Sequence, residues 1–574
     1  MSYYVGMYIA TVPNRGSRPA ILLREGYREG GQVKNRTLAN LSAWPSAKVE
    51  LLRRVLRDEH LAPVDQLFTV VASPQHGHVQ AVRTAMRRLG FEALLASRPS
   101  RERALVVAMV VARILAPESK LATTRWWHTT TLPADLGVAD ADEDACYLAM
   151  DWLLARQARI EQKLAARHLR AGGLVLYDLT SSYFEGTTCP LAAFGHDRDG
   201  KKGKRQVNYG LLSDARGCPV AVSVFRGNTG DPKTLLPAVE RVRTDFGIEQ
   251  LVLVGDRGMI SQTQITALQP LPGVDWITAL KTGAIRDLVA GGHLQLGLFD
   301  ERNLFELTSP DFPGERLVAC RNPELASLRA HKREALLAAT TQELERVRGM
   351  VARGRLTGQD AIGVRVGKVV NKYKVAKHIR LDIQDTGFAF QVDAAAVAAE
   401  AALDGLYVLR TRVPAARLDA DETVRSYKRL SQVERAFRSF KTVDLKVRPI
   451  RHRLESRVRA HIFLCLLAYY VEWHLLEAWR PLLFADEDQA AKATRDPVAP
   501  AMRSEAALRK VHTKLLDDGT VVHSFRTLLT ELSSIVRNVC RRHGAEADEP
   551  TFDVLTTPNA KQQRAFELLE TFTV

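Results

Sequence analysis

The chain has 574 residues, of which 46% are hydrophobic and 25% are charged, so it is long enough to form several hydrophobic cores. Its longest apolar runs, at 104–112 and 462–471, are too short to span a membrane, and the N-terminus shows no secretory signal pattern. The six cysteines include no CxxC pair, which argues against a disulfide framework or a zinc site and is typical of a cytoplasmic protein. The net charge of +16 predicts a polyanionic partner.

The N-terminal third divides into two predicted regions. Residues 1–75 predict a small β unit and a helix, because strand-like segments at 5–10 and 20–23 flank a turn-rich stretch and a helical pattern begins at Ser46. Residues 76–171 predict a set of helices. We expect this helical region to serve in binding DNA ends or in dimerisation, and a helical scaffold without such a role is the alternative.

Two apolar segments end in an aspartate. The run at 174–177 is followed by Asp178, and the run at 251–254 is followed closely by Asp256. A lone Asp would be expected to cap a strand end, but two buried strands that each deliver a carboxylate predict a metal site between them. The surrounding residues 172–282 predict the order β-β-β-α-β-α-β, which is that of an RNase H-like α/β fold.

An insertion is predicted between residues 172–282 and the next element of the RNase H-like core. Residues 283–420 predict an α+β insertion with a helix at 324–355, a hairpin at 379–383 and 388–392, and a strand at 405–410. Residues 421–480 are predicted to be helical and to complete the catalytic core with 172–282. A polar linker at 485–500 and a helical tail at 502–574 are predicted to form the C-terminal region, 481–574.

Positive charge is concentrated in one stretch of the helical region at 421–480. Residues 425–459 contain twelve Lys and Arg against three acidic residues, which favours nucleic-acid binding over an ordinary solvated helix face with mixed charges. Within this stretch we expect Arg448, Arg451 and Arg453 to contact phosphates.

The same stretch supplies a candidate for a third carboxylate, Glu434. In a regular helix Tyr427, Glu434 and Lys441 lie within about 20° of one line, because they are seven residues apart. An apolar stripe beside them would pack on the sheet; its members are Leu430, Val433, Phe437 and Phe440. An amphipathic helix with an incidental Glu is the alternative, and the two upstream aspartates weigh against it. Three carboxylates could hold two Mg²⁺ ions about 3.5–4 Å apart, with Mn²⁺ able to substitute.

These segments resemble a DDE transposase of a bacterial insertion sequence. The resemblance runs to about residue 480 and includes a large insertion before the third acid. Its most specific parts are 177–180, 227–231, 255–258, 404–410 and the Glu434 segment, which matches a Tyr-(2)-Arg-(3)-Glu-(6)-Lys signature. It implies that Asp178, Asp256 and Glu434 bind the metal ions. It also implies endonucleolytic cleavage at transposon ends, followed by strand transfer.

The resemblance implies double-stranded DNA as partner, both the terminal inverted repeats and the target, and we expect a nucleoid-associated homodimer without a membrane partner. Tyr427 and Lys441 are expected to hold phosphates, as are Arg257 and the loop at 198–205. One position departs from the signature, because its Arg falls on Leu430.

Two arginines could replace the missing one. Arg429 is adjacent but points away from Glu434 in a regular helix, whereas Arg438 lies on the same face. We therefore expect Arg438 to supply the guanidinium, unless a local distortion brings Arg429 round. Two other functions stay open: an RNase H-like nuclease that only hydrolyses, and a catalytically silent DNA-binding repressor.

Overall fold

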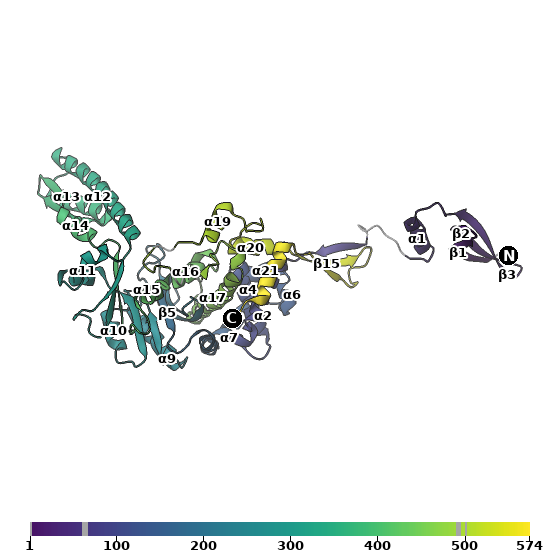
Figure 1. Ribbon diagram of the computed structural model, residues 1–574, viewed down its shortest axis with the longest axis horizontal. Coiled ribbons are helices and arrows are strands. Elements are labelled where there is room, and N and C mark those ends of the chain that lie inside the picture. Colours follow the sequence, from purple (N-terminus) through teal and green to yellow (C-terminus); the bar gives the residue numbers. More distant parts are fainter. Residues whose placement is uncertain (1–2, 60–66, 490–494, 500–501, 574) are drawn as a thin grey trace. The chain divides into compact units, whose positions relative to one another are not determined.

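The computed structural model describes residues 3–59, 67–489, 495–499 and 502–573, which form two units (Figure 1). The smaller unit comprises Met1–Ser73 and Arg537–Leu555, and the larger comprises Pro74–Val536 and Thr556–Val574. None of the described helices combines the length and the apolar character that a membrane span requires. The predicted linker at 485–500 lies partly outside the described residues.

The smaller unit contains two three-stranded antiparallel sheets. The first is formed in order by β1 (Tyr3–Asn14), β2 (Ser17–Glu29) and β3 (Gln32–Asn40), and α1 (Ser46–Val55) follows it. The second has the order β16-β15-β4 and joins β4 (Phe68–Ala72) to β15 (Arg537–Arg542) and β16 (Phe552–Leu555). The predicted β unit and the helix at Ser46 are confirmed. The purely helical tail is wrong at 537–555, because its strands pair with a segment at the other end of the chain.

The larger unit is built on an eight-stranded mixed sheet with the order β10-β11-β14-β9-β8-β5-β6-β7. Its first part follows the predicted order of elements: β5 (Leu174–Tyr183), β6 (Gln206–Ser213), β7 (Pro219–Arg226), α9 (Pro232–Thr244), β8 (Leu251–Val254), α10 (Gln262–Leu268) and β9 (Val274–Ala279). Strands β5, β6 and β7 form an antiparallel meander, whereas β5, β8 and β9 run parallel. Strands β6 and β8 are buried along their whole length, as the continuous apolar sequence of β8 predicts.

Part of the predicted insertion belongs to this sheet. Strands β10 (Leu304–Leu307), β11 (Arg316–Arg321) and β14 (Leu406–Thr411) extend it beyond β9 by antiparallel pairing. Helix α11 (Thr282–Ala290) packs against these added strands, because Ile285 and Leu288 share a core with Phe305, Leu317 and Leu406. The rest forms a separate group of helices around the predicted hairpin (Figure 1): α12 (Pro323–Ala352), α13 (Gln359–Tyr373), β12 (Ile379–Ile383), β13 (Phe388–Val392) and α14 (Ala394–Ala401). Helices α12 and α13 share a small core with this hairpin, including Leu344, Val366 and Phe388.

Helices cover the other end of the sheet and surround one central helix, α17 (Glu455–Ala478). The N-terminal helices are α2 (Gly77–Arg88), α3 (Phe91–Leu95), α4 (Arg101–Leu115), α5 (Lys120–Trp126), α6 (Leu132–Leu136), α7 (Glu143–Leu154) and α8 (Gln157–His168). The C-terminal ones are α19 (Glu505–Thr513), α20 (Phe525–Leu532) and α21 (Ala560–Thr571). The predicted helices at 76–171 are confirmed.

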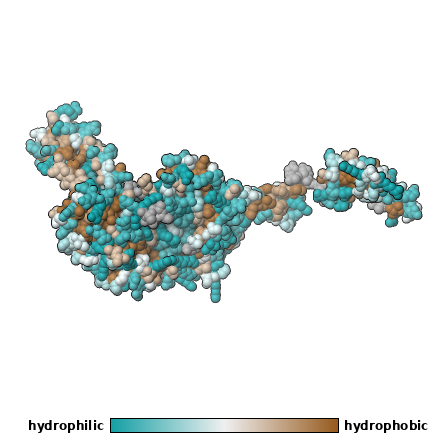
Figure 2. Space-filling model, in the orientation of Figure 1, coloured by the Kyte–Doolittle hydropathy of each residue, from teal (hydrophilic) through white to brown (hydrophobic). Residues whose placement is uncertain are grey.

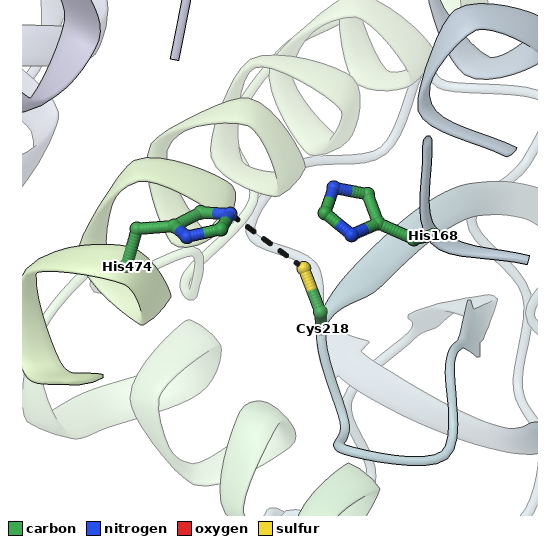
Figure 3. Close-up of side chains that lie close together, drawn as sticks. All are labelled: His168, Cys218 and His474. Atoms are coloured by element: carbon green, nitrogen blue, oxygen red, sulfur yellow. Dashed lines mark hydrogen bonds between the residues drawn. The ribbon is translucent and has the colours of Figure 1, made fainter. Parts of the chain in front are cut away.

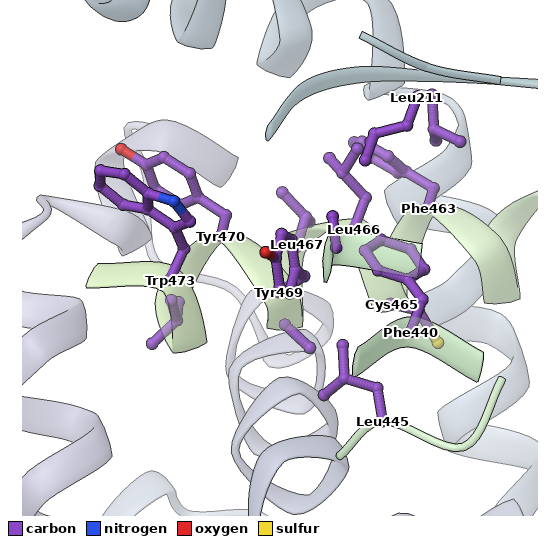
Figure 4. Close-up of a cluster of buried hydrophobic side chains, with 14 of the residues drawn as sticks. Leu211, Phe440, Leu445, Phe463, Cys465, Leu466, Leu467, Tyr469, Tyr470 and Trp473 are labelled. Atoms are coloured by element: carbon purple, nitrogen blue, oxygen red, sulfur yellow. The ribbon is translucent and has the colours of Figure 1, made fainter. Parts of the chain in front are cut away.

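Helix α17 is buried on all sides over residues 460–475, most of which are apolar, and this is the pattern of a core helix. Figure 4 shows its side chains, among them Phe463, Leu466 and Tyr470, packed between neighbouring elements. These side chains are fully buried, and each contributes roughly 1.5–3 kcal/mol by leaving water. Helices α4 and α7 and strand β7 all pack against α17, so it ties the N-terminal helices to the sheet. By contrast, the visible surface is mostly hydrophilic (Figure 2).

Candidate active site

Asp178 lies within β5 and not at its end, which corrects the predicted strand boundary. The strand continues to Tyr183 because β6 pairs with it throughout, and Asp178 lies opposite Leu211. Strand β8, however, pairs with β5 only as far as Leu176. Asp178 is therefore the first polar residue beyond the end of β8, and its Oδ1 accepts a hydrogen bond from the Leu179 N–H at 2.8 Å.

Asp256 lies in the turn that follows β8. Its Oδ1 accepts hydrogen bonds from the backbone N–H groups of Gly258 (3.0 Å) and Met259 (2.8 Å), which fixes the orientation of the carboxylate. Because β5 and β8 are adjacent and parallel, the two aspartates meet at the same edge of the sheet, as predicted from sequence.

Glu434 reaches this edge from α16 (Leu430–Arg438). The predicted apolar stripe holds the helix on the sheet, since Phe437 and Phe440 are buried with ring centroids 6.1 and 6.4 Å from that of Tyr209 on β6. Gly217, in the turn between β6 and β7, permits this close packing: a Cβ there would lie 2.5 Å from the side chain of Gln432.

The three carboxylates line one cavity of about 250 Å³, whose other lining residues are Tyr427, Lys428, Leu430 and Ser431. The pKa of Asp178 is raised to about 7, mainly by burial and also by the charges of Asp256 and Glu434, and the Leu179 N–H and Arg198 oppose this rise. Such a set of carboxylate oxygens suits a divalent cation, which would compensate the negative charge gathered in the cavity.

The helix that carries Glu434 is not regular, which corrects the predicted alignment of Tyr427, Glu434 and Lys441. Arg429 separates α15 (Ala420–Lys428) from α16, and α16 passes into a π-helical turn at Ser439–Val443. A spacing of seven residues keeps side chains in line only while each turn has about 3.6 residues. Tyr427 still lines the carboxylate cavity, but Lys441 lines a neighbouring one.

Lys441 is held in that neighbouring cavity by Asp199, a residue that sequence reasoning missed. The Asp199 side chain is only 2% exposed and forms ion pairs with Lys441 (2.9 Å) and Arg448. Its Oδ2 also accepts the backbone N–H of Tyr183 at 2.9 Å. Asp199 belongs to the loop at 198–205 that was predicted to contact phosphates, and Arg198 of the same loop is paired with Asp231. The only feature of the sequence that could have indicated this ion pairing is the alternation of acidic and basic residues in the loop.

The other predicted DNA-contacting residues fall into two groups. Arg429 pairs with Glu422 at 3.2 Å, and Arg451 pairs with Glu185 at 3.2 Å. In the part of the chain that the structure describes, no ion pair or side-chain hydrogen bond is found for the three remaining exposed residues, which are Arg257, Arg438 and Arg453.

The basic stretch at 425–459 is thus less available to a partner than its composition indicates. Seven of its twelve cations form ion pairs within the protein: Arg425, Arg429, Lys441, Arg448, Arg451, Arg457 and Arg459. For four of them, which are Lys441, Arg448, Arg451 and Arg457, the acidic partner is distant in sequence, so a local charge count cannot include it.

A second group of metal-type side chains lies outside the carboxylate cavity (Figure 3). His168 at the end of α8, Cys218 beside β7 and His474 in α17 each place one donor atom within 4.8 Å of the others. Because these residues are far apart in the chain, their spacing could not reveal the group. The Cys218 Sγ lies 3.9 Å from His474 Nε2, and the Arg216 guanidinium lies 3.5 Å from His168 Nδ1. A divalent ion would face that cation, so we interpret the group as core contacts.

Comparison with known protein families gives two matches. Residues 173–471, more than half of the chain, match the family model described as a transposase DDE domain. The chain therefore belongs to the DDE transposases, a class of enzymes that cleave and transfer DNA. Residues 9–63 match the N-terminal domain of IS1634 family transposases, which places it among the transposases of insertion sequences and confirms the resemblance noted in its motifs.

Comparison with solved structures adds no argument. The cryo-EM structure of a piggyBac transposase synaptic complex with hairpin DNA matches at a TM-score of 0.34 and 9% identity, over 77% of this chain and 85% of that one. A score this low carries no weight for the details of the fold. None of the curated proteins compared with the chain matches it.

Proposed function

We propose that this transposase cleaves DNA at the ends of an insertion sequence and joins the ends to target DNA, using two Mg²⁺ ions held by Asp178, Asp256 and Glu434. The observation that carries the proposal is the convergence of these carboxylates, from β5, the turn after β8 and α16, on one cavity. Mn²⁺ would substitute for Mg²⁺, because both prefer oxygen ligands. Bound there, the ions would activate the attacking oxygen and stabilise the leaving oxygen of a phosphodiester.

The sheet supports an RNase H-like core for this chemistry. An antiparallel meander, β5 to β7, followed by two parallel strands joined through α9 and α10, is the arrangement that the order of elements predicts. It delivers Asp178 and Asp256 from adjacent parallel strands to one edge, where open α/β sheets place their sites. We assign the catalytic core to 172–282 and 421–480, together with the three added strands β10, β11 and β14.

The chain's own residues would position the DNA. Tyr427 lines the carboxylate cavity, and burial raises the pKa of its phenol to about 12, so the hydroxyl stays protonated and can donate to a phosphate oxygen. Arg257 follows Asp256 directly and is exposed, and Arg438 is exposed one turn beyond Glu434. Their guanidinium groups suit bidentate contact with phosphate oxygens.

The N-terminal region would recognise the transposon ends. The enzyme would act as a homodimer that brings two ends together. The match of residues 9–63 to a transposase N-terminal domain supports a role for this region that is particular to transposases. The same match favours a transposase over the runner-up, an RNase H-like nuclease that only hydrolyses, because simple hydrolysis needs no end-specific module. Retention of all three carboxylates argues against a silent repressor.

The test uses the full chain, a duplex that carries an end of the element, a supercoiled target plasmid and Mg²⁺. Wild-type protein is expected to nick the duplex at the end and to join the freed 3′-hydroxyl to the plasmid. Asp178→Asn, Asp256→Asn and Glu434→Gln should each abolish both products while retaining duplex binding. Asp140→Asn, a change of an exposed carboxylate outside the cavity, is the matched control. Cleavage without joined product would favour the nuclease, and cleavage by any of the three variants would refute the metal assignment.

A further inference from the structure

A second cavity of the larger unit, of about 340 Å³, is lined mainly by cationic and imidazole side chains. It lies between the end of α4, the start of α5, the segment at 446–452 and α17. Its lining residues are Arg113, Pro117, Glu118, Ser119, Lys120, Tyr147, Lys446, Val447, Arg448, Pro449, Arg451, His452 and His461. The carboxylate cavity does not share any of these residues.

The two innermost cations of this cavity have no counter-charge. Lys120 is 4% exposed and Arg113 is 6% exposed, and over the described part of the chain neither forms an ion pair with a carboxylate. Arg113 donates only to backbone carbonyls, those of Glu118 (3.0 Å) and Leu445 (3.4 Å). Glu118, the acidic lining residue, is exposed and contributes its carbonyl. Burying two like charges without an anion is costly, and burial together with Arg113 lowers the pKa of Lys120 to about 7.

An imidazole in the same lining also lacks a partner. His461 is 5% exposed; its Nε2 lies 3.3 Å from the Val447 carbonyl oxygen, but its buried Nδ1 has no hydrogen bond. Because Nε2 donates to that carbonyl, Nδ1 is an acceptor, so the two unpaired cations and not this imidazole indicate the need for an anion.

The mouth of the cavity continues toward the predicted DNA-binding surface. Lys446 and Arg448 line both this cavity and the adjacent one that contains Lys441. Lys446 is exposed and adopts φ +44°, a left-handed conformation that costs a side-chain-bearing residue about 1–2 kcal/mol. Such strain persists only where the surroundings impose it, and here it places a lysine between two cationic cavities.

We propose that the Lys120 cavity binds a phosphate group of the DNA backbone and so anchors the strand at a distance from the carboxylate cavity. The identity of the ligand as DNA rests on the proposed function, whereas the need for an anion rests only on the unpaired Arg113 and Lys120. A tetrahedral phosphate offers acceptor oxygens in several directions and would accept from Lys120 and Arg113 together. The contact would add affinity without reading sequence.

The test compares the wild-type chain with Lys120→Met, which keeps the length of the side chain and removes its charge, and with the milder Lys120→Gln. The matched control is Lys510→Met, because Lys510 is also buried, at 7% exposure, but is paired with Glu487. Thermal unfolding is measured in chloride buffer and in inorganic phosphate at the same ionic strength. Binding of a DNA duplex is measured as a function of salt concentration.

Phosphate should raise the melting temperature of the wild type and of Lys510→Met, and the rise should vanish in Lys120→Met and Lys120→Gln. In chloride, Lys120→Met should melt at a higher temperature than the wild type, because an unpaired buried charge is removed, whereas Lys510→Met should melt at a lower one. The Lys120 variants should bind duplex DNA roughly fivefold more weakly, with a salt slope smaller by about 0.9.

Three results would overturn the proposal. One is an equal phosphate effect in wild type and Lys120→Met. Another is a lower melting temperature of Lys120→Met in chloride, which would assign Lys120 a structural role. A lost phosphate effect with unchanged DNA binding would assign the cavity to a free phosphate and overturn its role in DNA binding. None of these measurements requires cleavage, so a protein that fails only the end-cleavage test would refute the proposed function and leave the anion site standing.

Discussion

The carboxylate cavity and the Lys120 cavity are opposites in the same unit. The first gathers Asp178, Asp256 and Glu434, with Lys428 as the one basic residue in its lining, and the second gathers Arg113, Lys120 and further cations, with Glu118 as the one acid. By contrast, the buried Glu315 of the same unit is paired with Arg410.

The difference teaches how to separate binding sites from ordinary ion pairs. A folded chain minimises unpaired buried charge, because desolvation is not repaid without a partner. Like charges that remain together after folding therefore indicate a ligand of the opposite sign: a divalent cation for the carboxylates, and a phosphate for the cations. The same rule removes seven members of the basic stretch at 425–459 from the list of free phosphate contacts, since they already have acidic partners.

The largest expected effect is in the carboxylate cavity. Asp178→Asn should lower end cleavage on the order of 10³-fold or more, the scale seen when a catalytic group is removed. The same change should raise the melting temperature in EDTA, because it removes a carboxyl group whose ionised form is disfavoured first by burial and then by the charges of Asp256 and Glu434. It should also abolish the stabilisation of the wild type by Mg²⁺. Differential scanning fluorimetry with and without Mg²⁺ checks this. A lower melting temperature in EDTA would show that the acids are not in conflict.

In contrast to the charges in both cavities, the buried charge of Asp199 is balanced by cations of the protein itself. Asp199→Ala should destabilise the chain by about 3–5 kcal/mol, because Lys441 and Arg448 would lose their buried partner. Urea unfolding followed by circular dichroism measures the change, and Asp300→Ala, whose side chain is 80% exposed, serves as control. A loss below about 1 kcal/mol would mean that solvent reaches this cluster.

The two arginines around Glu434 sharpen the distinction between free and paired cations. Arg438→Ala should reduce end cleavage about tenfold, which is 1.4 kcal/mol, because Arg438 is exposed and can contact a phosphate. Arg429→Ala should have a smaller effect, since Arg429 already pairs with Glu422. The comparison is made in single-turnover cleavage of end DNA. A larger effect of Arg429→Ala would show that the break between α15 and α16 brings Arg429 to the substrate.

The smallest expected effect concerns the surface beyond the π-helical turn. Arg453→Gln should reduce the slope of log affinity against log salt by about 0.9, as expected for one lost phosphate contact. Arg451→Gln should change the slope less, because Arg451 is paired with Glu185 at 3.2 Å in the free protein. Fluorescence anisotropy on a labelled duplex measures both variants. Equal slopes for the two variants would mean that the ion pair opens on binding.

Local pattern was sufficient for much of this protein. Apolar runs of strand length predicted β5 and β8 and the aspartates beside them, and the order of elements predicted the first part of the sheet. An apolar stripe and one acid predicted how α16 would face the sheet. These features are set by residues within a few positions of one another, so periodicity and turn chemistry reveal them.

Only the tertiary structure decided what depends on distant partners. Strand β15 pairs with β4 across most of the chain, and Lys441 was moved from the Glu434 line to Asp199 by a helix break and a π-helical turn that no spacing rule anticipates. Whether a charge is free or paired is likewise a property of the folded neighbourhood. Lys120 and Lys510 are both buried lysines on short helices, yet folding gives an acidic partner to Lys510 and, in the described chain, none to Lys120.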